Sequence, residues 1–412
     1  MYQDGTDERE RRIELEENQR AAQLEIQQLR QQLQIRDQEK QQDNQQIQQQ
    51  GQQVQQQGQQ IQELQEQTQD TTIFEYVRSC YKILYSRLAP ETNRRLMTGK
   101  STVHHRGRPH PRQMRVWNNF LGEQQGLFEE IFNASPLNYR GFTPIIGLEN
   151  IEWNVDHFIS LNIEDPVKKI FEKLSLHAHG IQGLEELRVD GIRIEFVRSS
   201  LDTSEPQRGA AGERPAPTAR RDTAQLQPDS FCVVSRPGRT EGSREMTFVS
   251  EFKTFSVCSE EDAREIFAPR RNFGPTHLEE MQLKVAQISI VCQAYQYVMQ
   301  SFTEFGILTT GKVFVFLCVD LDEPGVLYFH VSTPDVDVTE ARARDEAEDA
   351  DNGVQVDENT RVRNSLYLTA VGQYLAFALR AYRRSLLPGQ EAHRRTYERL
   401  PRWPKDDGAM TI

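Results

Sequence analysis

The sequence has little of what marks secreted, zinc-binding or membrane proteins. Its 412 residues include only five cysteines, they form no C-x-x-C pair, and no apolar run approaches the roughly 20 residues of a bilayer-spanning helix. The odd number and wide spacing of the cysteines argue against a disulfide framework and a zinc site. The first residues, "MYQDGTDERE", lack the basic and then apolar pattern of a signal peptide. These absences predict an intracellular protein, nuclear or cytoplasmic, with buried thiols and no membrane partner.

Basic residues are also outnumbered by acidic ones. Lys and Arg number 49 against 61 Asp and Glu, for a net charge of −12, so nucleic acid could be bound only through local basic surface. One candidate is "HHRGRPHPRQMR" (residues 104–115), which has three interpretations: a solvated loop, a nucleic-acid contact through its arginines, or a metal site at His104, His105 and His110. The Arg-rich stretch "AYRRSLLPGQEAHRRTYERLPRW" is a second candidate for nucleic-acid binding.

Residues 1–70 are rich in Gln and differ from the rest of the chain. From residue 7 onward they contain a ladder of seven-residue spacing, which is typical of a coiled coil. The ladder positions are Ile26, Leu33, Lys40, Ile47, Val54 and Ile61, with Leu29 and Leu64 on the companion seam. The middle of that seam is polar, so a disordered arm is the alternative. A coiled coil would make residues 7–70 a site of homo-oligomerisation.

The remainder reads as a mixed α/β (α+β) domain with a central mixed β-sheet flanked by helices. We expect a helical lead-in over residues 72–135, the domain itself over 140–388, and a C-terminal tail over 389–412. Within the domain, the Pro-, Gly- and Arg-rich stretch 201–227 predicts a disordered insertion. Residues 334–359 predict an acidic loop, and residues 277–302 a long helix.

The stretches "PDSFCVV" and "TFVSEFK" predict an antiparallel hairpin. Such a hairpin can bring Asp229, before the first strand, next to Glu251, near the end of the second. Two adjacent carboxylates repel one another unless a hard divalent cation such as Mg²⁺ lies between them. Lys253 shares a strand face with Glu251 and would stand beside the ion. The simpler alternatives are a hairpin salt bridge between Glu251 and Lys253, and a turn residue at Asp229.

Together these residues resemble the core motif of PD-(D/E)XK nucleases, and "QAYQY" resembles the Q-x-x-x-Y element of the RecB-like group. The following "FGILTTGKVFVFL" is similar to type I restriction nuclease subunits, and residues 283–383 look like PD-(D/E)XK-like proteins of filamentous fungi. At the level of the fold the resemblance covers Trp117 to Arg383. It implies a restriction-endonuclease-like core.

The resemblance also implies roles for individual residues. Asp229, Glu251 and Lys253 would be catalytic, and Gln293 and Tyr297, four apart on one helix face, would bind substrate or organise the site. Asp229 and Glu251 would hold Mg²⁺ or Mn²⁺ together with an acid from the first core helix, for which Glu164 is the nearest candidate and Glu172 the second. Without the resemblance, Gln293 and Tyr297 could be ordinary polar residues of a buried helix.

Two functions follow from these observations. The first is metal-dependent hydrolysis of phosphodiester bonds in DNA or RNA. The alternative is a catalytically silent nuclease fold that acts as an interaction or nucleic-acid-binding protein, oligomerised by its N-terminal arm.

Overall fold

The computed structural model describes most of the chain after residue 70 and parts of the segment before it. The described residues are 70–85, 105–134, 138–140, 155–177, 191–198, 228–236, 244–255, 257–352, 358–385, 396–397 and 399–404, with further ones between 23 and 58. The chain forms two units, Met1–Gln69 and Asp70–Ile412. The predicted insertion 201–227 lies outside the described residues.

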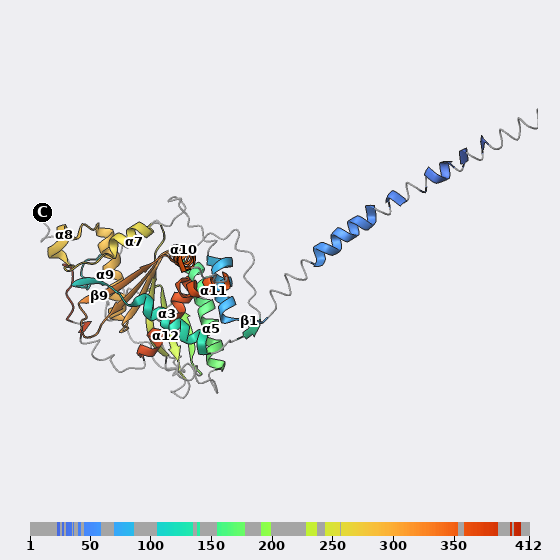
Figure 1. Cartoon of the computed structure of the whole chain (residues 1–412). Coiled ribbons are helices and arrows are strands. Elements are labelled where there is room, and N and C mark those ends of the chain that lie inside the picture. Colours follow the sequence, from blue (N-terminus) through green and yellow to red (C-terminus); the bar gives the residue numbers. More distant parts are fainter. Residues whose placement is uncertain are drawn as a thin grey trace, which may run out of the picture. The chain divides into compact units, whose positions relative to one another are not determined.

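A seven-stranded mixed sheet organises the second unit (Figure 1). Its strands follow one another across the sheet in the order β2 (Gln113–Val116), β9 (Val326–Ser332), β8 (Phe314–Val319), β7 (Phe305–Thr309), β6 (Arg244–Phe252), β5 (Ser230–Ser235) and β4 (Arg193–Val197). β2 runs parallel to β9 and β6 parallel to β7, whereas all other neighbours in this sheet are antiparallel. The predicted α/β class with a central mixed sheet is therefore confirmed.

The central strands are buried on both faces. In β8, Phe314 and Phe316 belong to one hydrophobic core, and Val315 and Leu317 belong to another on the opposite face. This division follows from the period of two in a strand. A strand covered on both sides needs apolar residues at every position, which explains the uninterrupted apolar run "VFVFLCV".

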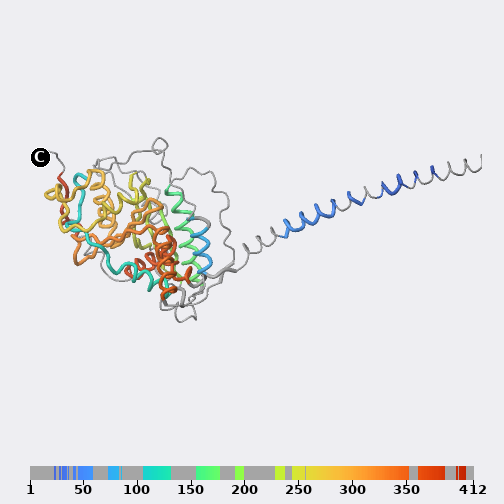
Figure 2. The backbone as a smooth tube through the Cα atoms, turned by 45° about the horizontal axis from the view of Figure 1, so that its top comes forward, coloured from blue at the N-terminus to red at the C-terminus, as the bar shows by residue number. Residues whose placement is uncertain are grey.

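Helices from distant parts of the chain cover the two faces (Figures 1 and 2). The first core includes residues of α2 (Ile73–Ser79), α3 (Phe120–Ala134), α5 (Asp165–His177) and α12 (Ala370–Ser385). The second core includes residues of α7 (Glu260–Ile266) and α9 (Val285–Gln300). Because α9 packs on β6 and β7, its side chains lie against the strand that carries Glu251.

The helix before β4 is built in three parts. α4 (Val155–Ile159) continues through a π-helical turn, Ser160–Glu164, into α5. Turns of this kind occur mostly as single insertions in helices and frequently at functional sites. Here the turn ends at Glu164, the acid proposed from the first core helix.

The predicted acidic loop 334–359 is wrong over most of its length, because residues 334–352 form helix α10 (Pro334–Asn352). Proline suits the first helical position, and the Asp337 carboxylate accepts hydrogen bonds from the Ser332 hydroxyl and the Thr333 N–H. The Ala- and Glu-rich run "EARARDEAEDA" has high helix propensity. Charge alone was therefore a poor indication of a loop.

The predicted boundaries of the domain are also wrong at both ends. β2 lies within the expected lead-in 72–135, yet it forms an edge of the main sheet through its pairing with β9. At the other end, Leu400 and Trp403 of the expected tail 389–412 are buried in the second core. The folded unit therefore includes both segments.

The helix expected over 277–302 is interrupted. A 3-10 turn, Pro275–His277, leads into the short α8 (Leu278–Met281), and α9 begins only at Val285. Gln282 adopts a left-handed backbone conformation with φ of 54°, which ends α8. Within the described ranges, none of the helices has both the length and the apolar character needed to cross a membrane.

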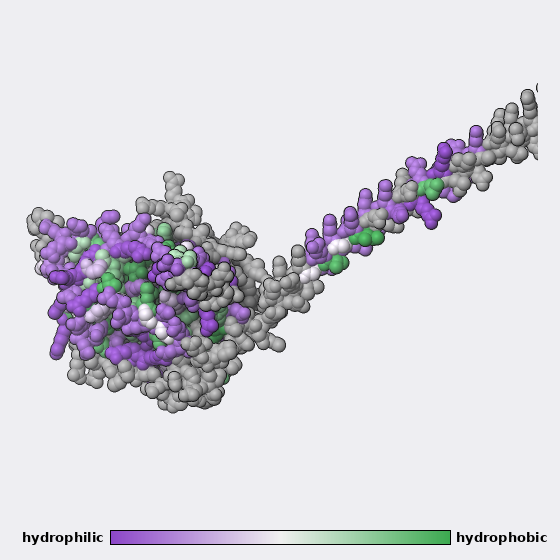
Figure 3. Space-filling view, viewed as in Figure 1, coloured by the Kyte–Doolittle hydropathy of each residue, from purple (hydrophilic) through white to green (hydrophobic). Residues whose placement is uncertain are grey.

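The described residues of the first unit are helical and exposed. The apolar ladder residues among them, Leu33, Ile47 and Val54, are 60%, 65% and 68% exposed, and the ladder residue Lys40 is exposed as well. Figure 3 shows apolar residues recurring along this unit among hydrophilic ones. The ladder positions Ile26 and Ile61 lie outside the described residues, and the coiled coil itself stays a prediction.

Candidate functional site

The hairpin of β5 and β6 places the two predicted acids at the same end of the sheet. Ser230 pairs with Ser250 in antiparallel register, so one step further along the strands Asp229 stands opposite Glu251. The Asp229 carboxylate accepts a hydrogen bond of 2.7 Å from the Phe252 N–H. This bond holds Asp229 against the end of β6.

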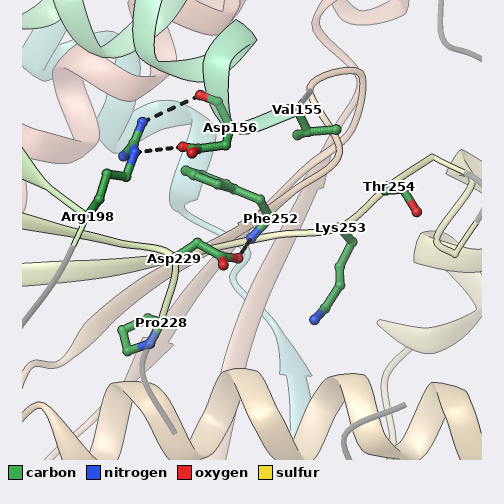
Figure 4. Close-up of a pocket in the computed structure, with 8 residues that line it drawn as sticks. All are labelled: Val155, Asp156, Arg198, Pro228, Asp229, Phe252, Lys253 and Thr254. Atoms are coloured by element: carbon green, nitrogen blue, oxygen red, sulfur yellow. Dashed lines mark hydrogen bonds and ion pairs between the residues drawn. The ribbon is translucent and has the colours of Figure 1, made fainter. Parts of the chain in front are cut away.

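Lys253 completes the group immediately after β6. Its Nζ donates to Oε1 of Glu251 at 2.6 Å and to Oε1 of Gln293 at 3.0 Å. The side chain of Phe252 packs against the first core instead, and Figure 4 shows Phe252 and Lys253 extending to opposite sides. The salt bridge considered from the sequence is thus present, as one part of a larger polar network.

Gln293 and Tyr297 join this network from α9. Nε2 of Gln293 donates to Oε1 of Glu251 at 2.7 Å and to the Tyr297 hydroxyl at 3.0 Å. Lys253, Glu251 and Gln293 therefore form a closed triangle of hydrogen bonds. Because Gln293 and Tyr297 are one helical turn apart, α9 fixes the orientation of Gln293 and, through it, of the Glu251 carboxylate.

Burial changes the acidity of both carboxyl groups. It raises the pKa of Glu251 to about 7, although nearby Lys253 lowers it; the Asp229 carboxyl raises it further. Burial also raises the pKa of Asp229 above its ordinary value, against the lowering effect of the Phe252 N–H. Two neighbouring carboxyl groups in such a place are stable when they share a proton or when a cation neutralises them.

One oxygen of the Glu251 carboxylate is available to bind a shared proton or a cation. Oε1 accepts from Lys253 and Gln293, whereas Oε2 is buried and accepts no hydrogen bond from the described residues. A buried acceptor without a partner carries a free-energy cost of about 1–3 kcal/mol. A proton shared with the Asp229 carboxyl, or a cation, would satisfy this oxygen.

The acids lie beside a pocket of about 490 Å³ (Figure 4). Its lining comes from the start of α4, the end of β4, the start of β5 and the end of β6. The lining residues are Val155, Asp156, Arg198, Pro228, Asp229, Phe252, Lys253 and Thr254. The pocket thus contains two of the predicted catalytic residues, Asp229 and Lys253.

Glu164 lies close to this pocket but is bound to other residues. Its side chain is 2% exposed, and it accepts hydrogen bonds from NH1 and NH2 of Arg198 at 3.1 and 2.6 Å and from the Ser230 hydroxyl at 3.1 Å. Burial raises the pKa of Glu164 above its ordinary value, while Arg198 lowers it. Glu172, the second candidate, is exposed on α5 and does not line the pocket.

Arg198 and Asp156 are pocket residues that the sequence did not reveal. Nε of Arg198 lies 2.6 Å from Oδ1 of Asp156, and its guanidinium carbon lies 5.2 Å from the centre of the Phe252 ring. Arg198 follows a strand and Asp156 lies in a short helix, positions that no short motif connects. Their contact depends on packing between segments some 40 residues apart.

The basic segment 104–115 is not a solvated loop where it is described. His105, Arg108 and His110 are all buried. Nδ1 of His105 lies 3.2 Å from the Ser289 hydroxyl, and NH1 of Arg108 donates to Gln296 at 3.0 Å. His104 lies outside the described residues.

Among the described residues, no three or more His, Cys, Asp or Glu side chains are grouped as a metal site, so Asp229 and Glu251 are a pair.

The fold and the pocket define a mixed α/β protein with a paired-carboxylate site at the end of a β-hairpin. Among curated proteins, the chain is similar to the meiotic driver SPOK2 of Podospora anserina, with 23% identity over 364 residues. The match covers 78% of this chain and 44% of SPOK2, so this chain spans less than half the length of that relative. No family model matches the chain, and neither does any solved structure.

Proposed function

We propose that the protein is a metal-dependent phosphodiesterase that hydrolyses DNA or RNA. One observation carries the proposal: Asp229 and Glu251 stand together at the end of a hairpin, with Lys253 bound to Glu251 and a pocket beside them. SPOK2 is described as a meiotic driver, which names a genetic behaviour and no reaction, so the chemistry of the pocket is the main support.

The order of the elements supports a PD-(D/E)XK-like core. α5 and the strands β4, β5 and β6 come first, α9 follows, and β7 returns parallel to β6. In the family that the sequence resembles, the acids stand on two successive strands and the Q-x-x-x-Y element on the next helix. The positions of Asp229, Glu251, Gln293 and Tyr297 agree with that pattern.

The pair of carboxyl groups fits Mg²⁺ or Mn²⁺. Proteins commonly hold Mg²⁺ through one or two carboxylates, with water completing the coordination. The buried Oε2 of Glu251 accepts no hydrogen bond from the described residues, and the Asp229 carboxyl raises the pKa of Glu251. When both carboxyl groups are ionised, the pair carries more negative charge than Lys253 alone offsets, and such an ion would balance it. When bound there, a divalent ion would polarise the phosphate and promote ionisation of the attacking water.

The side chains around the acids have separate tasks in this proposal. Gln293, oriented by Tyr297, holds the Glu251 carboxylate in place. Lys253 supplies a fixed positive charge beside the pocket, where negative charge accumulates on the phosphate in the transition state. Because the pocket already holds this charge in position, little reorganisation is needed during the reaction.

Cleavage of labelled DNA and RNA in Mg²⁺ or Mn²⁺ tests the proposal. Lys253→Ala should lower the rate by at least about 100-fold, the typical loss for one group that stabilises transition-state charge, while thermal unfolding remains cooperative. Lys284→Ala, at the exposed start of α9, is the matched control and should cleave normally. Equal degradation by the wild type and Lys253→Ala would contradict the proposal; binding without cleavage would favour the catalytically silent alternative.

A further inference from the structure

Arg198 is bound by two acids that differ greatly in exposure. Glu164 is 2% exposed and accepts two hydrogen bonds from the guanidinium group, whereas Asp156 is 45% exposed and forms an ion pair with its Nε. The buried contact is costly to break, because it would leave an uncompensated buried charge. The contact with Asp156 is easier to exchange, because the Asp156 side chain is 45% exposed, although its Oδ1 is buried against the guanidinium group. Asp156 is therefore the exchangeable partner of Arg198.

The side of Arg198 that contacts Asp156 faces the proposed reaction site. Asp156, Arg198 and Asp229 all line one pocket (Figure 4), and the Phe252 ring lies under the guanidinium group while the Phe252 N–H holds Asp229. Arg198 is the single arginine among the described residues that line this pocket. An anion that replaced Asp156 would thus lie in the pocket of Asp229 and Lys253.

The chemistry of the guanidinium group limits the anion to a carboxylate or a phosphate. An arginine fork binds carboxylates and phosphates in the same manner, with paired N–H donors. Glu164 accepts from NH1 and NH2, whereas Asp156 contacts Nε through its carboxylate and NH2 through its backbone carbonyl at 3.5 Å. A substrate phosphate could therefore take the place of the Asp156 carboxylate beside Nε and NH2. We propose that Arg198 is a phosphate-binding subsite for the nucleic-acid backbone, that Asp156 covers it in the free protein, and that Glu164 anchors the arginine. This inference rests on the proposed function, since it assigns a contact of that same substrate.

The two acids should then have opposite effects on binding. Asp156→Asn removes the competitor and should tighten binding of nucleic acid by up to about fivefold, which corresponds to an exposed ion pair. Glu164→Gln leaves Arg198 less firmly anchored and should weaken binding. If Glu164 were instead a metal ligand, its substitution would weaken Mn²⁺ binding in the absence of nucleic acid.

The experiment measures binding of fluorescent DNA and RNA oligonucleotides by anisotropy, with Ca²⁺ in place of Mg²⁺ to limit cleavage. Asp156→Asn is compared in the wild type and in a Glu164→Gln/Arg198→Gln background. That background has the same net charge as the wild type and leaves no unpaired buried charge, and its folding is checked by thermal unfolding. Arg198→Lys, which keeps the charge but loses the fork, provides a second background.

The subsite is supported if Asp156→Asn tightens nucleic-acid binding when made in the wild type. The same substitution should give no gain in affinity in the Glu164→Gln/Arg198→Gln background and a smaller gain in Arg198→Lys. An equal gain in all backgrounds would reflect general charge removal and would overturn it, as would no gain at all. Cleavage assays on the same oligonucleotides separate the two proposals. If the protein cleaves but the gain in affinity does not depend on Arg198, the subsite alone is refuted. If the gain depends on Arg198 but no cleavage occurs, the proposed phosphodiesterase activity alone is refuted. Failure of every variant to bind counts against both.

Discussion

Glu251 is a buried acid whose protonation depends on how the fold surrounds it. Its pKa of about 7 in the folded protein lies well above the ordinary value near 4.5, so between these pH values the folded state holds a proton that the unfolded state has lost. Stability falls with rising pH wherever the native state binds more protons. The contribution is fully present below about pH 4.5 and is lost as the pH rises through 7.

We therefore expect the metal-free protein to lose roughly 2–3 kcal/mol of stability from this group between pH 5 and 8, at about 1.4 kcal/mol per pKa unit. Urea unfolding across this range should show a steeper decline in the wild type than in Glu251→Gln. Added Mn²⁺ should stabilise the wild type more at pH 8 than at pH 6, because its ligands must be deprotonated. Parallel pH profiles for the two proteins would show that Glu251 titrates normally.

The sequence predicted the residues of the candidate site that lie in one hairpin and one helix, and the structure brings them together. Asp229 and Glu251 meet because a two-strand register is local, and Gln293 reaches them because one helix packs on β6. Arg198 and Asp156 could not be identified in this way. Their ion pair depends on packing between α4 and the end of β4, for which alternation and motif spacing contain no information.

At the scale of elements, the C-terminal segment fixes the basic segment against α9. The N–H of Gly107 donates to the Trp403 carbonyl, and the Trp403 N–H donates to the Arg108 carbonyl, both at 3.0 Å. The Trp403 ring is 1% exposed, and its Nε1 donates to Sγ of Cys292 at 2.8 Å. The segment thus joins the start of the sheet domain to the helix of the proposed site.

Trp403→Ala should lower the free energy of unfolding by about 3–5 kcal/mol, as expected for truncating a fully buried large aromatic residue. Urea unfolding of the whole chain measures this. Leu176→Ala is the control, because Leu176 is 74% exposed on α5 and should change stability by less than about 0.5 kcal/mol. A loss below about 1 kcal/mol for Trp403→Ala would mean that the segment contributes little to the core.

The elements predicted correctly are those with strong local patterns, and the errors have physical causes. The hairpin of β5 and β6 was predicted because its strands are apolar or alternating runs joined by a turn-rich segment. β2 was missed because it is short and its partner β9 lies more than 200 residues away. The break before α9 was missed because Gln282 adopts the left-handed conformation. Glycine usually occupies such positions and marks them in a sequence.

In the whole molecule, the N-terminal unit has apolar side chains that a single chain leaves exposed. Its described residues are helical, and Leu33, Ile47 and Val54 expose apolar side chains at positions of the seven-residue ladder, with Lys40 between the first two. A helix that stands alone buries none of this stripe, whereas pairing with a second copy would bury it in a coiled-coil seam. We propose that the arm joins copies of this chain, so that each assembly has more than one pocket.

Light scattering coupled to size exclusion tests this association on the full chain. The wild type should have a mass at least twice the 47.7 kDa of one chain, and Ile47→Glu/Val54→Glu should reduce it, because charges in the seam repel one another and cannot be desolvated. Gln48→Glu/Gln55→Glu is the matched control, with the same charge and spacing one position further along the helix and away from the seam. A monomeric wild type would refute the proposal. Equal dissociation by both double variants would trace the effect to net charge, since only the first pair of substitutions alters the apolar stripe.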